Sequence, residues 1–360
     1  MRIGIDYTAA VRQGAGIGRY TRGLVRALAE IDRENRYVLF SAGRDPQGGW
    51  PSNYSTRSVP LTDRQLSIVW QRLRLPIPIE LVTGRVDILH SPDFVLPPTL
   101  ARHTVLTVHD LSYMRYPECS SAPLLAYLMD AVPRSVARAE VILADSHSTR
   151  RDLGDLLHVP AERVVVLYAG VEPRFVPQED ATVASVLAKY DLRQPFILGL
   201  GTLQPRKNFA RLIRAYYQMR EEHGVLHQLV IGGGRGWLYE DIDATITELG
   251  LADQVRLIGY VQDDDLPGLY AAADLFAFPS LYEGFGIPIL EAMGCGTPVV
   301  AANSSSLPEV AGDAAVLVDP EDVDALAEAL WRVITDAELR QTLVARGHEQ
   351  VRRFSWRASA

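Results

Sequence analysis

The feature that most constrains the fold of this 360-residue chain is a repeated alternation of short, β-rich apolar runs with longer helical patterns. The first series contains the runs at 3–6, 37–40, 86–90, 104–110, 141–146 and 164–170. A second series follows at 195–201, 227–234, 254–260, 273–280, 296–302 and 314–319. Strands that alternate with helices in this way are typical of parallel, doubly wound sheets. We therefore predict an α/β protein with two Rossmann-like domains and a cleft between them.

The two series are separated by a stretch rich in proline and charge, VEPRFVPQED at 171–180. This composition is typical of a linker, so we place the domains at 1–172 and 173–360. The chain is long enough for each domain to bury its own core. Ligands of open parallel sheets bind at the carboxyl ends of the strands, and the functional residues are expected there.

The composition excludes several classes of protein. The chain is 48% hydrophobic and 22% charged, which is typical of a soluble globular protein. No apolar run is long enough to span a bilayer, and the first residues indicate a strand rather than a signal peptide. The net charge of −8 argues against a nucleic-acid partner. The two cysteines, Cys119 and Cys295, lack metal-ligand spacing, so we expect a reduced, cytoplasmic protein.

Charge is distributed unevenly along the chain. Residues 1–175 carry 21 basic and 18 acidic side chains, whereas the remainder carries 15 basic and 26 acidic ones. The basic first half is compatible with an anionic acceptor or a membrane surface as partner. Segment 62–82 combines Trp70 and leucines with several arginines. It either packs on the first sheet as a helix or lies peripherally on the inner face of a membrane that presents a lipid-linked acceptor.

Neither glycine-rich loop has a known dinucleotide or Walker pattern. The loop around Gly14, Gly16 and Gly18 and the loop IGGGRGW at 231–237 both lack the third glycine of G-x-G-x-x-G. Gly16 and Gly18 nevertheless precede a predicted helix that begins near Arg19. Backbone N–H groups at such a position can approach an anion closely. A plain strand-to-helix turn is the structural alternative.

The most specific segment is SLYEGFGIPILEAMGCGTPVV at 280–300. Gly284 and Gly286 stand just before a predicted helix, and Pro288 fits the first turn of that helix. The N–H groups and the positive end of the helix dipole would form a seat for a diphosphate.

Two glutamates accompany this segment. Glu291 lies about one turn into the helix, where its side chain is directed back toward the helix start and its carboxylate can accept from ribose hydroxyls. Glu283, on the preceding loop, is expected to face the sugar. An acidic helix cap would explain Glu291 alone, but not Glu283 together with the two glycines.

A basic pair, Arg206 and Lys207, follows the first strand of the second domain. A guanidinium binds phosphate oxygens in bidentate fashion, and an adjacent ammonium adds a compact charge. Cations are unfavourable at a helix start unless an anion is present. The pair therefore indicates a phosphate ligand more than a solvated surface.

Together these residues resemble glycosyltransferase family four, the retaining enzymes of the GT-B fold, and within it the bacterial mannosyltransferases. The resemblance covers nearly the whole chain and implies that the first domain, 1–172, binds the acceptor and the second, 173–360, the nucleotide-sugar donor. It implies a donor site formed by Gly16, Gly18, Arg206, Lys207, Val261, Asp263, Glu283, Gly284, Phe285, Gly286, Ile287 and Glu291. It implies that His109, Glu283, Arg206 and Lys207 are the catalytic groups. The chain has Thr202 where many members carry an additional arginine.

The resemblance places His109, at the end of the run TVLTVHD, near the transferred sugar. A histidine satisfied within the fold is the structural alternative. Asp110 either orients its imidazole or caps the next turn, and Ser146 either contacts the ligand or caps the following helix.

The reaction that the resemblance implies moves a hexose from a nucleotide-diphosphate sugar to a hydroxyl of a saccharide or lipid-linked acceptor in surface polysaccharide synthesis. The D-x-D triplets at 241–243, 263–265 and 322–324 fall in helical contexts, so we expect no metal and no other cofactor. Asp263 follows a strand where related enzymes hold the base, which favours guanine and hence GDP-mannose. A GT-B sugar-nucleotide epimerase and a non-catalytic nucleotide-sugar-binding subunit are the alternatives.

Overall fold

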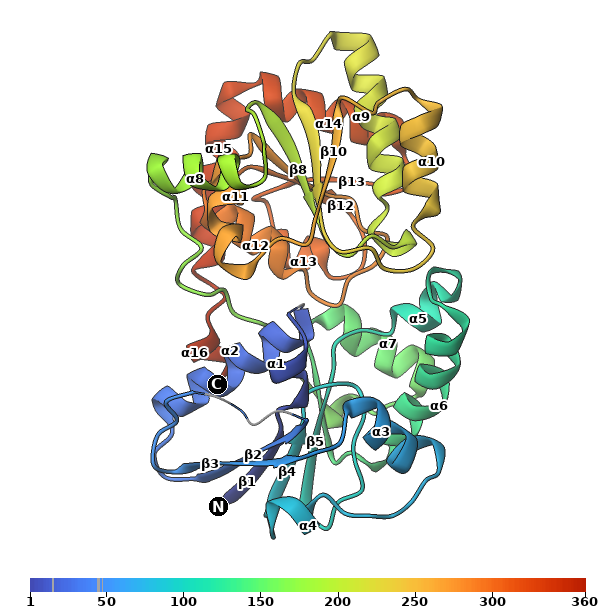
Figure 1. Cartoon of the computed structure of the whole chain (residues 1–360), viewed down its shortest axis with the longest axis vertical. Coiled ribbons are helices and arrows are strands. Elements are labelled where there is room, and N and C mark those ends of the chain that lie inside the picture. Colours follow the sequence, from blue (N-terminus) through green and yellow to red (C-terminus); the bar gives the residue numbers. More distant parts are fainter. Residues whose placement is uncertain (15, 44–45, 47) are drawn as a thin grey trace. The chain divides into compact units, whose positions relative to one another are not determined.

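A computed structural model describes residues 1–14, 16–43, 46 and 48–360 (Figure 1). The chain divides into two compact units. Unit 1 contains Met1–Arg115, Ala122–Gly170 and Trp356–Ala360, and unit 2 contains Tyr116–Ser121 and Val171–Ser355. The main division, after Gly170, lies two residues from the predicted one. The exchange of two short segments between the units was not predicted.

Unit 1 is built on a parallel sheet that, over the described residues, has seven strands in the order β3-β2-β1-β4-β5-β6-β7. The strands are β1 (Arg2–Asp6), β2 (Arg36–Ala42), β3 (Tyr54–Val59), β4 (Ile88–Ser91), β5 (His103–Val108), β6 (Val141–Ala144) and β7 (Val164–Val166). The α-helices are α1 (Thr8–Arg12), α2 (Gly16–Ile31), α3 (Asp63–Ser67), α4 (Glu80–Thr83), α5 (Ser112–Arg115), α6 (Ala122–Arg138), α7 (His147–Leu157) and α16 (Trp356–Ser359). Single turns of other helix types are η1 (Ile68–Arg72) and η3 (Ala161–Arg163).

Unit 2 repeats this plan with a six-stranded parallel sheet in the order β10-β9-β8-β11-β12-β13, again over the described residues. Its strands are β8 (Phe196–Leu200), β9 (Gln228–Gly232), β10 (Val255–Gly259), β11 (Leu275–Phe278), β12 (Val299–Ala302) and β13 (Val316–Val318). Its helices are α8 (Asp180–Lys189), α9 (Phe209–His223), α10 (Glu240–Glu248), α11 (Leu266–Ala272), α12 (Ile287–Gly294), α13 (Leu307–Ala311), α14 (Val323–Thr335) and α15 (Ala337–Val351). The turns η2 (Pro117–Cys119), η4 (Pro205–Lys207) and η5 (Asp263–Asp265) complete it.

Helices cover both faces of each sheet (Figure 1), and in unit 2 the central strands β8 and β11 are accordingly apolar along their whole length. In unit 1, Leu89 and Leu106 are fully buried on β4 and β5. In unit 2, Leu229 on β9 packs in one core with Leu212 of α9 and Leu330 of α14. The predicted fold class, two doubly wound Rossmann-like domains, is therefore confirmed.

Each sheet has one point where the strand order reverses. In unit 1 the chain runs outward from β1 to β3 and then returns to place β4 on the other side of β1. In unit 2 the same reversal separates β8 from β11. Ligands of doubly wound sheets bind at the carboxyl ends of the strands at this switch point, so each unit has one preferred position for a site.

The last residues of the chain belong to unit 1 through a close contact between α16 and α2. The indole of Trp356 lies where a Cβ on Gly23 would be, at 2.3 Å from the nearest ring atom, and stacks edge-on against Tyr20. Only glycine at position 23 leaves room for this ring.

Among the described residues, no helix combines the length and apolarity that crossing a membrane requires.

Candidate functional site

The loops after β8 and β11 form the candidate site of unit 2, at the switch point of its sheet. Turn η4, in the first loop, carries Arg206 and Lys207, and the second loop carries Glu283 just before α12. Backbone hydrogen bonding joins the loops, because the Leu281 N–H donates to the Arg206 carbonyl over 2.9 Å. Parallel pairing of β8 with β11 thus brings together residues that are 76 positions apart.

Arg206, Lys207 and Glu283 form an ion cluster. Lys207 Nζ lies 2.6 Å from Glu283 Oε1, and Arg206 Nη1 lies 3.0 Å from Glu283 Oε2. The three side chains are only 16%, 13% and 11% exposed, respectively. Burial alone would raise the pKa of Glu283, but Arg206 and Lys207 lower it to about 2. The cluster therefore contains two cations and one carboxylate in a mostly buried position, and it has a net positive charge.

Serine hydroxyls hold the Glu283 loop in place. The Glu283 N–H donates to Ser305 Oγ over 2.8 Å, and Ser306 Oγ donates to the carbonyls of Glu283 and Phe285. Arg206 also donates to the Tyr282 carbonyl over 2.5 Å. With its backbone fixed in this way, the carboxylate of Glu283 is preorganised rather than free on a mobile loop.

Helix α12 begins beside the ion cluster. Gly286 precedes it with a φ of +112°, and a Cβ there would lie 2.8 Å from Leu307 Cδ2, so both conformation and space require glycine. Pro288 occupies the first turn, as predicted. Gly284 and Phe285 are buried, and Ile287 is partly exposed at the first position of the helix. The positive end of the α12 dipole adds to the positive charge of the cluster.

In unit 1, His109 is the centre of a buried network at the ends of three neighbouring strands. Its Nδ1 lies 2.7 Å from Asp145 Oδ2, and its Nε2 lies 2.9 Å from the Pro92 carbonyl. Burial alone would lower the pKa of His109, but the Asp145 carboxylate raises it to about 9. Both ring nitrogens therefore donate, and His109 is an imidazolium at neutral pH. Tyr20 and Phe94 pack edge-on against the ring.

Comparisons with known proteins agree with this geometry. The family described as Glycosyltransferase Family 4 matches residues 14–175, and the family described as Glycosyl transferases group 1 matches residues 188–350. O-antigen chain mannosyltransferase B of Escherichia coli is 36% identical over 95% of this chain and 92% of its own length. The chain belongs to glycosyltransferase family four.

Two further similarities were found. The serotype-specific mannosyltransferase WbdA of Escherichia coli is 34% identical over 62% of this chain, and the match spans 28% of that longer protein. The solved structure of sucrose-phosphate synthase from Thermosynechococcus elongatus superposes with a TM-score of 0.78 at 22% identity, covering 100% of this chain and 96% of that one. The latter similarity is one of fold. The chain is thus a glycosyltransferase with two Rossmann-like domains.

Some of the predicted site residues of unit 2 are in direct contact with one another, and others are not. Arg206, Lys207 and Glu283 are in direct contact, next to the α12 N-terminus. Glu291 is only 1% exposed on α12, and its Oε2 accepts a 3.1 Å hydrogen bond from the Tyr270 hydroxyl. Its contact with a ribose stays a prediction.

The residues predicted to hold the base lie after β10. Val261 is buried, and Asp263 is partly exposed at the start of η5. The Asp263 carbonyl accepts a 2.6 Å hydrogen bond from Arg174 Nη1, which also lies 3.2 Å from Asp264 Oδ1. The carboxyl end of β10 is thus fixed by the segment that enters unit 2.

Gly16, Gly18 and His109 all belong to unit 1. Helix α2 begins at Gly16, three residues earlier than predicted, and a Cβ on Gly16 would meet nothing within 4 Å. A Cβ on Gly18 would lie 2.0 Å from the Gln13 carbonyl oxygen, so close packing alone requires glycine there. Ala15, directly before Gly16 in the predicted loop, is outside the described residues.

Two predicted alternatives around His109 are resolved by hydrogen bonding. Asp110 caps the next turn, since its Oδ1 accepts from the Ser112 N–H over 2.8 Å, and Asp145 is the residue that orients the imidazole. Ser146 caps α7 by accepting from the Thr149 N–H. Asp145 was missed because it is 36 positions from His109, although it follows a strand that the sequence predicted.

The three D-x-D triplets lie in helical contexts, as predicted: the first in α10, the second in η5, and the third at the start of α14. Within the described residues there is no group of three or more His, Cys, Asp or Glu side chains placed to hold a metal ion. Independence of a metal stays a prediction.

Proposed function

We propose that this glycosyltransferase moves mannose from GDP-mannose, with retention of configuration, to a hydroxyl of a saccharide or lipid-linked saccharide in surface polysaccharide synthesis. The observation that carries the proposal is the ion cluster, whose two cations share one carboxylate in a mostly buried position. The oxygens of a diphosphate are suitable ligands for two such adjacent cations. The 36% identity to an O-antigen chain mannosyltransferase supports mannose as the sugar and a polysaccharide as the product.

In the proposed reaction, the bond between the sugar C1 and the β-phosphate oxygen breaks while the acceptor oxygen bonds to C1 from the same face. The acceptor proton passes to the departing phosphate oxygen. Arg206 and Lys207 stabilise the charge that develops on the diphosphate. Glu283 is a poor covalent nucleophile because both its oxygens are held by cations. Its role is to position those cations and to stabilise positive charge on the flattening sugar ring.

The choice of GDP rests on Asp263, whose carboxylate can accept from N1 and N2 of guanine. We expect GDP to bind more tightly than UDP in calorimetry, and Asp263→Ala to weaken GDP binding while leaving UDP binding unchanged. Tighter binding of UDP would contradict the assignment of the base. His109 is expected to act near the transferred sugar through the groups that it positions, since both its nitrogens are occupied.

The decisive experiment measures sugar transfer by the purified chain with GDP-mannose, other GDP- and UDP-sugars, and mannose-terminated glycosides. We expect transfer from GDP-mannose, with an α-linked product and full activity in EDTA. An inverted product, or activity that is lost in EDTA and restored by magnesium or manganese, would overturn the mechanism. Conversion of the donor to an epimer without any acceptor would support the epimerase instead, and binding without turnover the non-catalytic subunit.

A peripheral membrane contact is proposed for segment 62–82. Leu66 is buried and Trp70 packs against Phe40, so part of the segment belongs to the fold of unit 1. Leu73 and Leu75 are exposed beside exposed arginines, a combination that suits an anionic lipid surface. Binding to anionic vesicles that is lost in Leu73→Ser/Leu75→Ser would support it, and equal binding of wild type and variant would exclude this segment. The cytoplasmic location also stays a prediction.

A further inference from the structure

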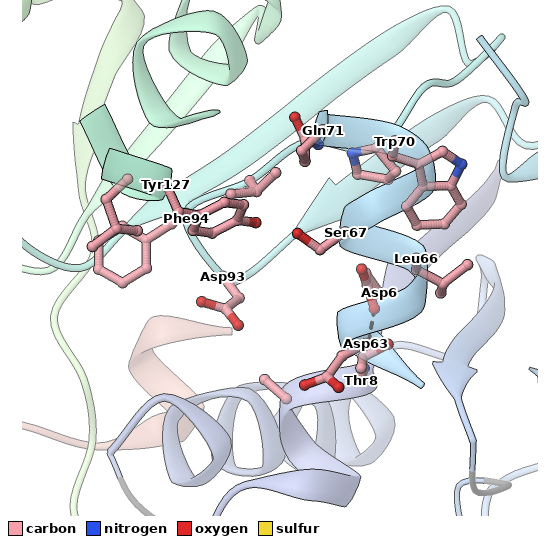
Figure 2. Close-up of a pocket in the computed structure, with 14 residues that line it drawn as sticks. Asp6, Thr8, Asp63, Leu66, Ser67, Trp70, Gln71, Asp93, Phe94 and Tyr127 are labelled. Carbon is pink, nitrogen blue, oxygen red and sulfur yellow. Dashed lines mark hydrogen bonds between the residues drawn. The ribbon is translucent and has the colours of Figure 1, made fainter. Parts of the chain in front are cut away.

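A cavity of about 170 Å³ lies at the switch point of unit 1, the position that corresponds to the ion cluster in unit 2. Asp6, the last residue of β1, and Asp93, two residues after β4, stand at its floor (Figure 2). Its volume is several times the ~30 Å³ that one water occupies in the liquid. This space is large enough for one sugar ring. The cavity belongs entirely to unit 1.

The walls of the cavity combine two kinds of surface. Aromatic side chains line it on two sides, Phe94 and Tyr127 on one and Trp70 on the other, and Figure 2 shows the carboxylates of Asp6, Asp63 and Asp93 around the same space. Carboxylates are acceptor-only groups that form strong hydrogen bonds to hydroxyl donors. Aromatic rings offer flat apolar surface to the C–H face of a ring. A hydroxyl-rich ring with apolar faces matches both surfaces.

The His109 network fixes the acidic edge of this cavity. His109 donates to the carbonyl of Pro92, the residue directly before Asp93, and its positive charge attracts the Asp93 carboxylate. The Gln13 side chain also hydrogen-bonds Asp93, while burial raises the pKa of Asp93 to about 6. Above that pH the group is ionised. The buried cation thus helps to hold the Asp93 carboxylate in a defined place.

The charge of the cavity selects against anions. Within the described part of the chain, neither arginine nor lysine is among the residues that line it. Arg12, which is not a lining residue, pairs with Asp63 over 3.2 Å. A phosphate or carboxylate on the ligand would face carboxylates at short range, where like charges repel strongly. The basic character of the first half of the chain therefore does not extend to this cavity.

We propose that this cavity binds a single uncharged hexose unit of the acceptor, through hydroxyls donated to Asp93 and Asp6 and a ring face laid on one of the two aromatic sides. The proposal rests on the proposed function, since it assumes that the chain takes a saccharide acceptor. The acceptor sugar that binds in this cavity is uncharged, and Asp93 is a residue that determines specificity for it. His109 is then a positioning residue that acts through the Pro92 carbonyl.

The test measures binding of methyl α-mannoside and its 6-phosphate to the donor-free protein by saturation-transfer NMR. We expect the neutral glycoside to bind wild type, and Asp93→Asn to weaken that binding about tenfold or more, as expected when a charged acceptor is lost. The phosphorylated glycoside should bind wild type more weakly than the neutral one, and Asp93→Asn should narrow this difference. Asp155→Asn is the matched control, because Asp155 is an exposed carboxylate of the same unit, on α7.

A second variant, Ser67→Gln, fills the cavity without removing a carboxylate, and it covers the case in which Asp93→Asn fails to fold. Ser67→Gln should abolish binding of the neutral glycoside and leave GDP binding by unit 2 unchanged. Equal binding of methyl α-mannoside to wild type and both folded variants, no binding to wild type, or preference for the phosphate would overturn the proposal. If Asp93→Asn transferred mannose from GDP-mannose with an unchanged KM for the acceptor, the proposed acceptor site in this cavity would be refuted and the proposed function would stand. If Asp93→Asn lost binding of the glycoside but the wild-type protein transferred no sugar, only the proposed function would be refuted.

Discussion

At the scale of single residues, the chain offers a direct comparison between its two lysines, Lys207 and Lys189. The stem of Lys207 lies over Gly201, where a Cβ would come within 3.1 Å of Lys207 Cε, and its Nζ lies 5.0 Å from the centre of the Phe278 ring. Lys207→Ala should lower kcat/KM by roughly 10²- to 10⁴-fold, because a preorganised charge leaves the developing anion. Lys207→Arg should recover only part, since the larger planar group does not fit the same space.

Lys189→Ala is the control for this series. Lys189 is 53% exposed and pairs with Asp265 over 2.6 Å, outside the ion cluster. Steady-state kinetics should give wild-type kcat/KM for Lys189→Ala. Equal losses in the two alanine variants, or none in either, would show that Lys207 has no specific role in transfer.

Glu283→Gln removes the single carboxylate of the ion cluster and leaves its two cations together. We expect the free energy of unfolding to fall by about 3–5 kcal/mol, the usual result of breaking a buried ion pair from one side. The same change removes an internal competitor for Arg206 and Lys207, so GDP should bind more tightly and restore much of the lost stability. Turnover should fall strongly, because the carboxylate no longer stabilises the transition state.

The control for this variant is Glu321→Gln, at an exposed carboxylate that lies 3.8 Å from Arg211. Thermal unfolding with and without GDP should give wild-type values for it. If Glu283→Gln bound GDP more weakly than wild type, the positioning of Arg206 and Lys207 by the carboxylate would outweigh its competition with GDP for these cations.

At the scale of elements, the docking of α16 on α2 depends on Gly23. A methyl group at this position would overlap the Trp356 ring, so Gly23→Ala should destabilise unit 1 by about 1–3 kcal/mol, the usual cost of overpacking. Gly154→Ala on α7 is the matched control, because its Cβ would meet only one atom, at 3.9 Å. It should stabilise the protein by about 0.5–1 kcal/mol. Chemical denaturation checks both signs, and stabilisation by Gly23→Ala would show that α16 does not pack tightly.

Elements with strong local signals were predictable from the sequence, and those that depend on distant contacts were not. The central strands β8 and β11 of unit 2 are continuous apolar runs, and α12 has glycine before it and proline in its first turn. Strand β3, YSTRSV, was missed because it is polar and pairs only with β2 at the sheet edge. The turn at 116–121 was assigned to the first domain because its tie to unit 2, a 2.7 Å hydrogen bond from Trp237 to the Cys119 carbonyl, spans 118 positions.

The candidate site shows the same limit. Arg206, Lys207 and Glu283 were identified separately from their residue types and spacing, but nothing in that spacing indicates that they pair with one another. Sharing a carboxylate requires β8 and β11 to be neighbours, which is a property of the strand order. For the same reason Asp145 and Asp93 became recognisable only once the strands that carry them were known to be adjacent to β5 and β1.

At the scale of the whole molecule, the two units have separate cores and separate titrating groups, so we expect two calorimetric transitions with different pH dependence. The pKa of His109, in unit 1, is about 9, above the 6.5 of an unfolded histidine. The fold therefore holds this proton more tightly than the unfolded chain does. Its contribution is complete below pH 6.5 and is lost as the pH rises through about 9, with a full size of order 3 kcal/mol.

In unit 2, the pKa of Glu283 is shifted in the opposite direction to that of His109. Its pKa of about 2 lies below the ordinary 4.5, so its contribution is present above pH 4.5 and is lost as the pH falls toward 2. Between pH 6.5 and about 8.5 the unit 1 transition should therefore move to lower temperature while the unit 2 transition stays in place. GDP should raise the transition of unit 2 more than that of unit 1, because most of the predicted donor residues belong to unit 2, and this difference assigns the two peaks.

The His109→Asn variant isolates the cause of this shift. Without the titrating ring, unit 1 should be less stable at pH 6.5, because Asp145 loses its buried partner, and its transition should no longer move with pH over this window. Glu283→Gln should leave the pH response of unit 1 unchanged and abolish the acid-side response of unit 2. A wild-type unit 1 transition that stays constant from pH 6.5 to about 8.5 would mean that His109 is neutral in the fold. In that case Nε2 or Nδ1 would lack its proton, and the network that fixes Pro92 beside Asp93 would have to be held by the Asp145 proton instead.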